Sequence, residues 1–363
     1  MVKILVATGG TGGHIFPAQA LAEQLQIRGA TVGAISNVPH AVRLEGGRNY
    51  CIRASAMNRQ SPLQKAKSLF VLGIGFLQAC LYILKSRPQV VVGFGGYATV
   101  PTILAAWILR RPIILHEQNA YAGQANRFLA RFARHIAVSF AETGGFDDMG
   151  QRRFTVIGNL VRPEFSHMRQ MPYGQFTKND TITLLITGGS QGAKIFSDIL
   201  PKALAILPKN LCARLRIHQQ VRAEFLQSLQ KAYQELGIVA KLEPFIHDMP
   251  QAICACHLMI ARAGASTLSE AAMVGRPCLL IPYPYATDDH QRANATMFAD
   301  RGAGWLLAQE DCTAETLAGR LQELLSRPKM LMIAAQSAKK LGQPDAPEAL
   351  ADLVLTQAKP DLE

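Results

Sequence analysis

The sequence predicts an α/β protein made of two Rossmann-like, doubly wound parallel sheets that face a cleft. Apolar runs of strand length alternate with helical patterns along the chain, which is typical of parallel sheets covered by helices. The pattern then restarts, because TGGSQG at 187–192 repeats TGGTGG at 8–13, and RPCLLIPYP at 276–284 echoes RPIILHEQN at 111–119. A chain of 363 residues also exceeds the size at which one core keeps growing, so two similar domains are expected.

The repeat also sets the expected domain boundaries. We expect an amino-terminal domain over 1–162, a polar, Pro-containing linker over 163–180, and a carboxy-terminal domain over 181–363. For the last helix of the chain, packing on the amino-terminal domain is the alternative to packing on the carboxy-terminal one. Ligands of doubly wound sheets bind beyond the carboxyl ends of the strands. The cleft between the two domains is therefore the predicted site.

The chain opens with a strand, a glycine loop and a helix. KILVA at 3–7 has the pattern of a buried strand, and we expect the helix from Pro17 to Arg28, closed by Gly29. Further units of strands and helices are predicted, in order, at 90–107, 111–133, 135–139, 181–194 and 257–275.

The composition favours a folded protein with an anionic partner. Hydrophobic residues make up 49% of the chain and charged residues 18%, which excludes a disordered chain. The formal charge of +12 favours phosphate groups or an acidic lipid surface. Nucleic acid is not expected as a partner, because the sequence has neither basic tracts nor the aromatic pattern of an RNA-recognition sheet.

The cysteines indicate a reducing compartment. Their number, 7, is odd and their spacing forms no disulfide framework, so reduced thiols in the cytosol are expected. Cys254, Cys256 and His257 are close in sequence, but no second pair follows at ligand spacing, and no zinc site is predicted. The first strand begins at Lys3, so no secretory signal is expected.

Three glycine-rich loops, at 9–13, 93–96 and 188–192, follow predicted strands. Consecutive glycines let a backbone turn with positive φ and direct its N–H groups at an anion, while the following helix adds its positive end. No loop continues into the Gly-Lys-Ser/Thr of an ATP-binding loop, and GGTGGH lacks the Gly-x-Gly-x-x-Gly register of dinucleotide sites. We interpret the loops as anion cradles; the alternative is a tight strand-to-helix turn without a ligand.

A fourth candidate for anion binding lies at 261–275. Ser266 or Thr267 is expected to cap a helix after Gly264, and the exposed N–H groups there suit a diphosphate. Glu270 falls in the first turns, where a carboxylate can accept two hydrogen bonds from a ribose diol. The alternative is a capping box from Thr267 to Glu270 that serves only the helix. No Asp-x-Asp pair occurs in the sequence, so no enzyme-bound metal is predicted.

Taken together, these motifs resemble the MurG family, bacterial glycosyltransferases that move N-acetylglucosamine from UDP to lipid I in peptidoglycan synthesis. The resemblance runs nearly end to end and keeps the family's order of blocks. The blocks are GGTGGHIFPA (9–18), GFGGYATVP (93–101), HEQNAYAGQANR (116–127), GNLVR (158–162), GGSQGA (188–193) and the long stretch 262–295. The resemblance implies a GT-B architecture, with UDP-N-acetylglucosamine on the carboxy-terminal domain and the lipid acceptor on the amino-terminal one.

The resemblance also implies roles for individual residues. For the donor nucleotide, the uracil is met near Phe245 and Ile246, the ribose by Glu270, and the diphosphate by Gly264, Ala265, Ser266 and Thr267 with Ser190 and Arg162. The sugar is met by Asn126, Gln291 and Asn294. Further donor contacts are expected from Thr11, Gly12, Gly13, Leu268, Ser269 and His290, and acceptor contacts from Gly9, Gly10, Gly95, Gly96 and Tyr97. Some members of the family carry a second glutamine where His290 stands in this chain.

The implied reaction inverts the anomeric centre. The 4-hydroxyl of the muramoyl sugar of lipid I attacks the anomeric carbon of N-acetylglucosamine as UDP leaves, without a covalent enzyme intermediate. His14 is the first candidate for the base, because an imidazole of pKa near 6.5 accepts a proton at cytoplasmic pH. The alternatives for His14 are a helix-start residue or a phosphate ligand. Glu117 and the acceptor's own hydroxyl environment are the rival sources of base.

The sequence also suggests a membrane-facing surface. The uncharged stretch 69–84 is shorter than the ~20 residues of a spanning helix and contains Gly73 and Gly75, so no transmembrane helix is expected. The basic residues near it are Lys65, Lys67, Lys85, Arg87, Arg110 and Arg111. Apolar side chains ringed by positive charge suit an anionic lipid surface, whereas the alternative is an ordinary buried crossover helix. With a lipid-borne acceptor, we expect a peripheral protein on the cytoplasmic face of the inner membrane, with other cell-wall synthesis proteins as possible partners.

Two other functions remain open from the sequence. A UDP-N-acetylglucosamine 2-epimerase shares the architecture and the nucleotide, and it would act on the nucleotide sugar without an acceptor. A non-catalytic sugar-nucleotide-binding protein at the membrane would keep donor affinity while His14 was dispensable.

Overall fold

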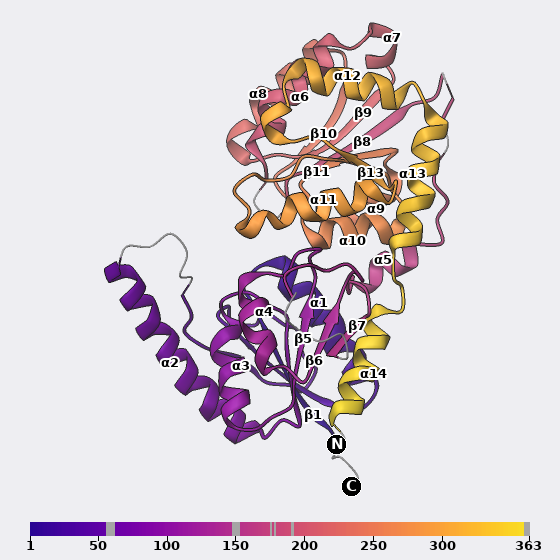
Figure 1. The fold of residues 1–363 in the computed structure, drawn as a ribbon. Helices are drawn as coiled ribbons and strands as arrows, with labels where there is room; N and C mark the ends of the chain where they lie inside the picture. Colours follow the sequence, from indigo (N-terminus) through magenta and orange to yellow (C-terminus); the bar gives the residue numbers. More distant parts are fainter. Residues whose placement is uncertain (56–61, 147–152, 175, 178, 190–191, 359–363) are drawn as a thin grey trace. The chain divides into compact units, whose positions relative to one another are not determined.

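The computed structural model describes residues 1–55, 62–146, 153–174, 176–177, 179–189 and 192–358 (Figure 1). The chain forms two compact units. Unit 1 comprises Met1–Arg162 with Gln343–Glu363, and unit 2 comprises Pro163–Gly342. Each unit contains one parallel sheet covered by helices, which confirms the predicted fold class.

The sheet of unit 1 has seven strands in the order β3-β2-β1-β4-β5-β6-β7. All pairs are parallel, and β1 lies between β2 and β4, with Ile4 opposite both Val32 and Val90. The strands are β1 (Lys3–Thr8), β2 (Thr31–Ser36), β3 (Asn49–Cys51), β4 (Val90–Gly93), β5 (Ile113–Glu117), β6 (His135–Val138) and β7 (Phe154–Val156). Central strands such as β4 are buried along their whole length, as the apolar runs predict for a sheet covered on both faces.

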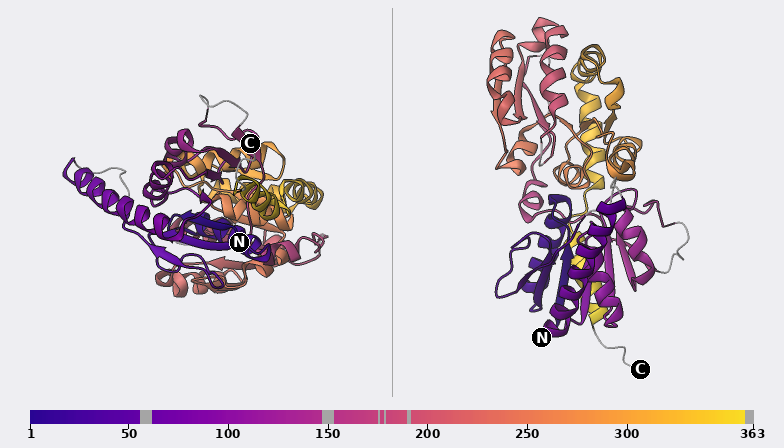
Figure 2. Two further views of the ribbon diagram at one scale, coloured as in Figure 1. Left: turned by 90° about the horizontal axis from the view of Figure 1, so that it is seen from below. Right: turned by 90° about the vertical axis from the view of Figure 1, so that its left-hand side faces the viewer.

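Helices cover both faces of this sheet. Its helices are α1 (Gly12–Ile27), α2 (Pro62–Ser86), α3 (Thr99–Ile108), α4 (Gln124–Leu129), the 3-10 turn η1 (Ala130–Phe132) and α14 (Ala346–Ala358). Residues of α1 and α14 share one core with one face of the strands, whereas residues of α2, α3 and α4 share a second core with the other. Helix α2 runs beside α3 (Figure 2).

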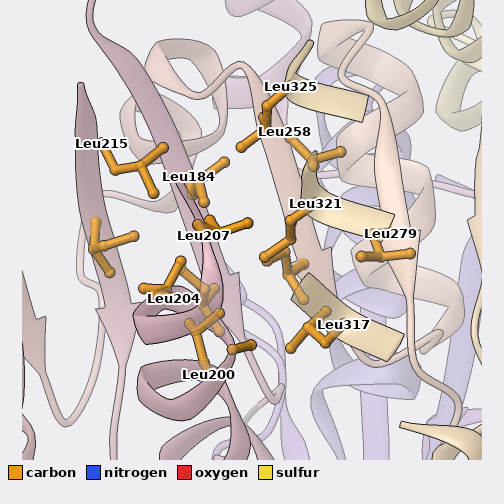
Figure 3. Packing of buried hydrophobic residues seen from close by; sticks show 14 of the residues in the cluster. Leu184, Leu200, Leu204, Leu207, Leu215, Leu258, Leu279, Leu317, Leu321 and Leu325 are labelled. Atoms are coloured by element: carbon orange, nitrogen blue, oxygen red, sulfur yellow. The ribbon is translucent and has the colours of Figure 1, made fainter. Parts of the chain in front are cut away.

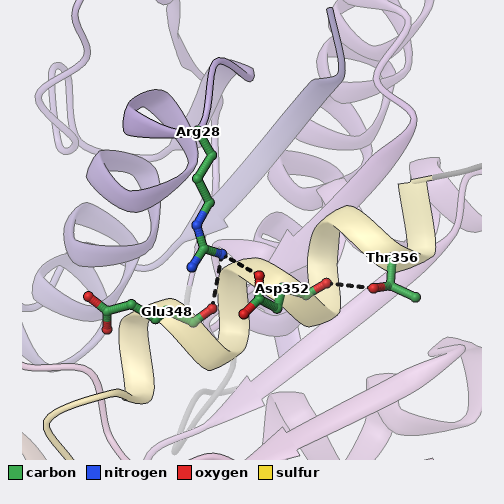
Figure 4. A network of polar contacts seen from close by, with 4 residues as sticks. All are labelled: Arg28, Glu348, Asp352 and Thr356. Carbon is green, nitrogen blue, oxygen red and sulfur yellow. Dashed lines mark hydrogen bonds and ion pairs between the residues drawn. The ribbon is translucent and has the colours of Figure 1, made fainter.

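Helix α14 returns from the end of the chain to unit 1. Its Leu350 and Val354 are fully buried in the core that α1 also lines. At the surface, Arg28 Nη1 donates to the Glu348 carbonyl oxygen at 3.1 Å and to Asp352 Oδ1 at 2.8 Å (Figure 4). The chain thus closes unit 1 with a helix that is far from the rest of the unit in sequence.

Unit 2 has a six-stranded parallel sheet in the order β10-β9-β8-β11-β12-β13. Its strands are β8 (Ile182–Thr187), β9 (Leu215–Gln220), β10 (Val239–Glu243), β11 (Leu258–Ala261), β12 (Cys278–Leu280) and β13 (Gly304–Leu306). Its helices are α5 (Pro163–Met168), α6 (Lys194–Ile206), α7 (Lys209–Cys212), α8 (Leu226–Glu235), α9 (Met249–Ala255), α10 (Ala265–Val274), α11 (His290–Asp300), α12 (Ala314–Leu325) and α13 (Pro328–Leu341). Leucines from β8, β9, α6 and α12 interlock in its largest core (Figure 3).

Described residues of the stretch 163–180 pack in unit 2. Phe165 on α5 is fully buried, and the helix contacts α9 and α10. The buried guanidinium of Arg276 donates through Nη2 to the carbonyl oxygens of Pro172, at 3.3 Å, and of Cys254, at 2.6 Å. The composition of the stretch is polar overall and only a few of its residues pack, so the sequence predicts a linker there.

Candidate active site

In unit 1, two glycine loops meet at His14. The Thr11 hydroxyl oxygen lies 2.9 Å from Nδ1 of His14. A methyl group added at Gly9 would lie 3.0 Å from the same nitrogen, and one added at Gly96 would lie 3.3 Å from Cε1. Gly96 has a φ of +81°, a conformation that glycine adopts without strain. The loops after the adjacent strands β1 and β4 therefore hold the imidazole between them.

His14 lies in the first turn of α1, which begins earlier than predicted. The backbone N–H groups of His14 and Ile15 both donate to the Thr11 carbonyl oxygen at 3.0 Å, so the helix starts at Gly12 rather than at Pro17. Pro17 is tolerated in the second turn, where it removes only the bond to the carbonyl of Gly13. The glycine loop is consequently short, and its last two glycines, Gly12 and Gly13, are helical.

Glu117 ends β5 and is almost fully buried. Its Oε1 accepts from the backbone and side-chain nitrogens of Asn119, both at 2.9 Å. Its Oε2 accepts from the Gly123 backbone at 3.1 Å and from Asn126 Nδ2 at 2.8 Å. A carboxylate engaged by four donors is poorly placed to take a proton from a substrate.

Asn126 on α4 is also buried, with 2% of its surface exposed. Its Nδ2 donates to Glu117 and to the His116 carbonyl oxygen, the latter at 3.1 Å. Its Oδ1 has no partner among the described residues. A methyl group at Gly95, whose φ is +85°, would lie 3.2 Å from Asn126 Nδ2. Asn126 therefore lies directly under the second glycine loop.

The sequence analysis missed Asn37, which follows β2. Its side chain lies against Gly10, where an added methyl group would be 3.2 Å from Oδ1. Its Nδ2 donates to the Tyr97 hydroxyl at 3.4 Å. Its place in the sequence could have indicated it. Asn37 directly follows β2, and β2 pairs with β1, so its side chain is expected at the same edge of the sheet as the glycine loops.

Arg162 is the last residue of unit 1 before the chain enters unit 2. Its guanidinium lies 4.8 Å from the centre of the Phe16 ring on α1. The same ring lies against Gly12, since an added methyl group there would be 3.0 Å from Cε2. The predicted diphosphate ligand thus belongs to the surroundings of the first glycine loop.

In unit 2, the predicted diphosphate cradle is a helix start. Gly264 is the extended N-cap of α10, which begins at Ala265, so Ser266 and Thr267 lie inside the helix. The expectation that either residue caps it is wrong, and the alternative capping box from Thr267 is excluded by the same boundary. The cap lacks a side-chain hydrogen bond, and Ser269 donates instead to the Ala265 carbonyl at 2.8 Å. Backbone N–H groups of the first turn are therefore the groups that would donate to an anion at this position.

Helix α11 lies beside this helix start. Asn294 is 1% exposed and its Nδ2 donates to the Ala263 carbonyl oxygen at 3.1 Å. His290 and Gln291 lie one turn earlier on the same helix face, because residues three and four positions apart are neighbours. His290 Nδ1 lies 2.6 Å from the Thr287 carbonyl oxygen, and Gln291 Oε1 accepts from the Tyr283 backbone at 3.0 Å.

The remaining predicted donor residues are more scattered within unit 2. Glu270 and Leu268 are both buried on α10. Phe245 is exposed and offers the surface of its ring to a base, whereas Ile246 is buried. Ser190 lies outside the described residues; its neighbours Gly189 and Gly192 have φ of +77° and +64°. Among the described residues, no cluster of three or more His, Cys, Asp or Glu side chains suits a metal ion.

Comparison with known proteins identifies the family. The glycosyltransferase family 28 N-terminal domain matches residues 4–138, and the glycosyltransferase family 28 C-terminal domain matches residues 183–350. A Rhodospirillum centenum protein is 46% identical, with 99% of this chain and 95% of that protein covered. It is named UDP-N-acetylglucosamine--N-acetylmuramyl-(pentapeptide) pyrophosphoryl-undecaprenol N-acetylglucosamine transferase. The chain belongs to the MurG family of glycosyltransferases.

Other relatives agree with this assignment to MurG. A transferase of the same name from Paramagnetospirillum magneticum is 44% identical over 97% of this chain and 96% of its own length. The crystal structure of Acinetobacter baumannii MurG superimposes with a TM-score of 0.79 at 29% identity, covering 98% of this chain and 100% of that one. A Neisseria meningitidis UDP-GlcNAc 2-epimerase reaches a TM-score of 0.68 at 12% identity, with 98% and 100% covered, a likeness of fold alone. The MurG family confirms the predicted hexosyltransferase class.

Proposed function

We propose that this chain transfers N-acetylglucosamine from UDP-N-acetylglucosamine to the 4-hydroxyl of the muramoyl sugar of lipid I. The observation that carries the proposal is His14, held between two glycine loops in a chain that matches MurG-family transferases over almost its whole length. A base beside an anion-binding loop is what attack by a sugar hydroxyl on a nucleotide sugar requires. The product is lipid II.

His14 is the general base of this proposal. The Thr11 hydroxyl lies 2.9 Å from His14 Nδ1, and in the tautomer in which Nδ1–H donates to it, Nε2 carries the lone pair that would accept the proton of the acceptor hydroxyl. Gly9, Gly10, Gly95, Gly96 and Tyr97 would line the acceptor's approach to His14. Glu117 is assigned no proton transfer, because its carboxylate is already occupied by four donors.

The start of α10 would hold the donor diphosphate. Its N–H groups carry partial positive charge toward the anion, and one preorganised donor to a developing negative charge is worth roughly 3 kcal/mol elsewhere. Glu270 would meet the ribose, and His290, Gln291 and Asn294 would meet the sugar. Arg162 and Ser190 complete the phosphate contacts, and no enzyme-bound metal enters the proposal.

A surface on α2 and α3 would dock on the anionic inner membrane from the cytoplasmic side. Among the described helices, α2 alone has the length and composition of a membrane span, over Gln64–Ser86. Its Ala79 and Ile83 are fully buried on the side that packs in unit 1, which argues for a helix that lies on a membrane rather than across it. On the described parts of α2 and α3, the large apolar side chains exposed by more than half are Leu69, Phe70, Leu77, Leu81, Leu84, Trp107 and Ile108, which we call the α2–α3 stripe. The basic residues Lys65, Lys67, Lys85, Arg87 and Arg110 are exposed around it.

The deciding assay combines the purified protein, a soluble lipid I analogue and labelled UDP-N-acetylglucosamine. We expect label in a β-linked disaccharide product and release of UDP. Incubation with the nucleotide sugar alone is the matched control. Formation of UDP-N-acetylmannosamine in that control would replace the proposal by an epimerase, and donor binding without any turnover would replace it by a sugar-nucleotide-binding protein.

A further inference from the structure

A buried polar network lies beneath the second glycine loop of unit 1. His116, Glu117 and Gln118 at the end of β5 are each at most 2% exposed, as is Asn126 on α4. Gln118 Nε2 donates to the Phe94 carbonyl oxygen at 3.0 Å and lies 3.2 Å from His116 Nδ1. His116 Nε2 lies 3.1 Å from the Gly158 carbonyl oxygen. The network therefore anchors the residue that precedes the glycines of the loop.

The same network supports the loop's glycines. Glu117 binds the amide of Asn126 at 2.8 Å, and this amide lies under Gly95. The next residue, Gly96, lies beside His14, since a methyl group added there would be 3.3 Å from Cε1 of the imidazole. One line of contacts thus runs from a buried carboxylate, through an amide and two glycines in the left-handed conformation, to the catalytic imidazole.

We propose that Glu117 and Asn126 are positioning residues, which fix His14 through the Gly95–Gly96 loop, rather than a base and a sugar ligand. The inference rests on the proposed function, because it assigns His14 the chemical step. Glu117 is suited to positioning because only a carboxylate, which accepts and does not donate, satisfies four converging donors. Asn126 is suited to it because both of its N–H groups donate inside the protein, which leaves only the buried Oδ1 for a contact with a sugar.

An exchange of the two side chains tests the pair. Glu117→Gln places a donor opposite the Asn126 amide, and Asn126→Asp places two carboxylates against each other. The double variant Glu117→Gln/Asn126→Asp again places one donor opposite one acceptor between the two side chains, while the contacts with the His116 carbonyl oxygen and the Gly123 N–H, which cannot reverse, stay mismatched. We expect each single variant to lower kcat by roughly tenfold or more and the double variant to recover several-fold over the worse single one.

Two further measurements separate positioning from other roles. The Kd for UDP-N-acetylglucosamine should stay within about twofold in all three variants, and the acid limb of the pH–rate profile should persist in Glu117→Gln. Loss of that limb, or a Kd raised in step with the loss of kcat in Asn126→Asp, would overturn the proposal. So would a folded double variant no more active than its worse parent. A wild-type protein without transferase activity would instead overturn the proposed function itself.

A second variant covers the case in which the exchanged proteins fail to fold. Gly95→Ala acts from the loop side, since its methyl group would strain a φ of +85° and press on Asn126. We expect it to lower kcat with little change in donor Kd. Gly319→Ala is the matched control, because Gly319 lies in α12 with open space around its Cα, and it should leave activity unchanged. Equal activity of Gly95→Ala and the control would contradict the proposal.

Discussion

At the scale of single residues, His14 is the side chain whose removal separates chemistry from donor binding. His14→Ala deletes the proposed base but leaves both glycine loops, so kcat should fall by about 10²–10⁴ while the Kd for UDP-N-acetylglucosamine changes little. Steady-state kinetics with a lipid I analogue and calorimetric donor titration measure the two effects. An unchanged kcat with a raised KM would make His14 a binding residue.

His116 gives a pH dependence of stability that is independent of catalysis. Burial lowers the pKa of His116 from 6.5 to about 4, because the charged imidazole would lose its hydration. The unfolded chain therefore binds the extra proton first, and stability present above pH 6.5 is lost as the pH falls toward 4, by about 3 kcal/mol in total. Denaturant unfolding at pH 7.5 and pH 5 measures the effect. Between these two pH values, the free energy of unfolding should fall less for His116→Gln than for the wild type, because glutamine keeps a donor for the Gly158 carbonyl oxygen but does not titrate.

The residues of the site differ in how far the sequence predicts them. His14 was singled out because it directly follows a glycine loop, and its role as the base stays a prediction. The partners of Glu117 and Asn126 were not visible, because which buried carboxylate meets which amide depends on how β5 and α4 pack, and no local pattern encodes that. Asn37 was missed for a related reason: its neighbours Gly10 and Tyr97 come from other strands.

At the scale of elements, the strands were predicted more accurately than the starts of helices. Apolar runs located β1, β5 and β8 because a fully buried strand has little freedom in composition. The starts of α1 and α10 lack a side-chain cap. Helix α1 begins where backbone N–H groups donate to the Thr11 carbonyl oxygen, and α10 begins after the extended backbone of Gly264. Predictions based on the residue types that usually begin helices were therefore wrong at the starts of both α1 and α10.

Helix α14 offers a test of what fixes an element to its unit. Leu350→Ala removes a fully buried side chain from the core shared with α1, and should cost roughly 2–5 kcal/mol. Asp352→Ala removes only the charged partner of Arg28, a carboxylate that is 72% exposed, and should cost less than about 1 kcal/mol. Denaturant unfolding of both variants compares the contribution of apolar packing with that of the ion pair. A larger effect of Asp352→Ala would show that the ion pair, rather than apolar packing, holds α14.

At the scale of the whole molecule, repetition was the informative signal. Two matched motifs in each half predicted two parallel sheets, and both sheets are present. The return of α14 to unit 1 was left open, since an amphipathic helix pattern indicates a buried face but not which sheet it covers. Patterns within a short segment predict its helix or strand. Which distant segments pack together, such as α14 and unit 1, depends instead on how well their packed surfaces fit.

The net charge of +12 and the α2–α3 stripe lead to a prediction about partitioning. Vesicles that contain anionic lipid should float the protein at low salt, and binding should weaken with added salt because the basic residues are exposed. Leu77→Gln/Leu81→Gln should reduce binding through lost apolar contact, and Lys65→Glu/Lys67→Glu through lost attraction. Ile333→Gln on α13 of unit 2 removes an apolar side chain of similar exposure, 58% against 62% for Leu77, and should bind like the wild type. Equal flotation of all four proteins would place the membrane contact elsewhere, and resistance of the wild type to extraction by salt and alkali would indicate that α2 spans the bilayer.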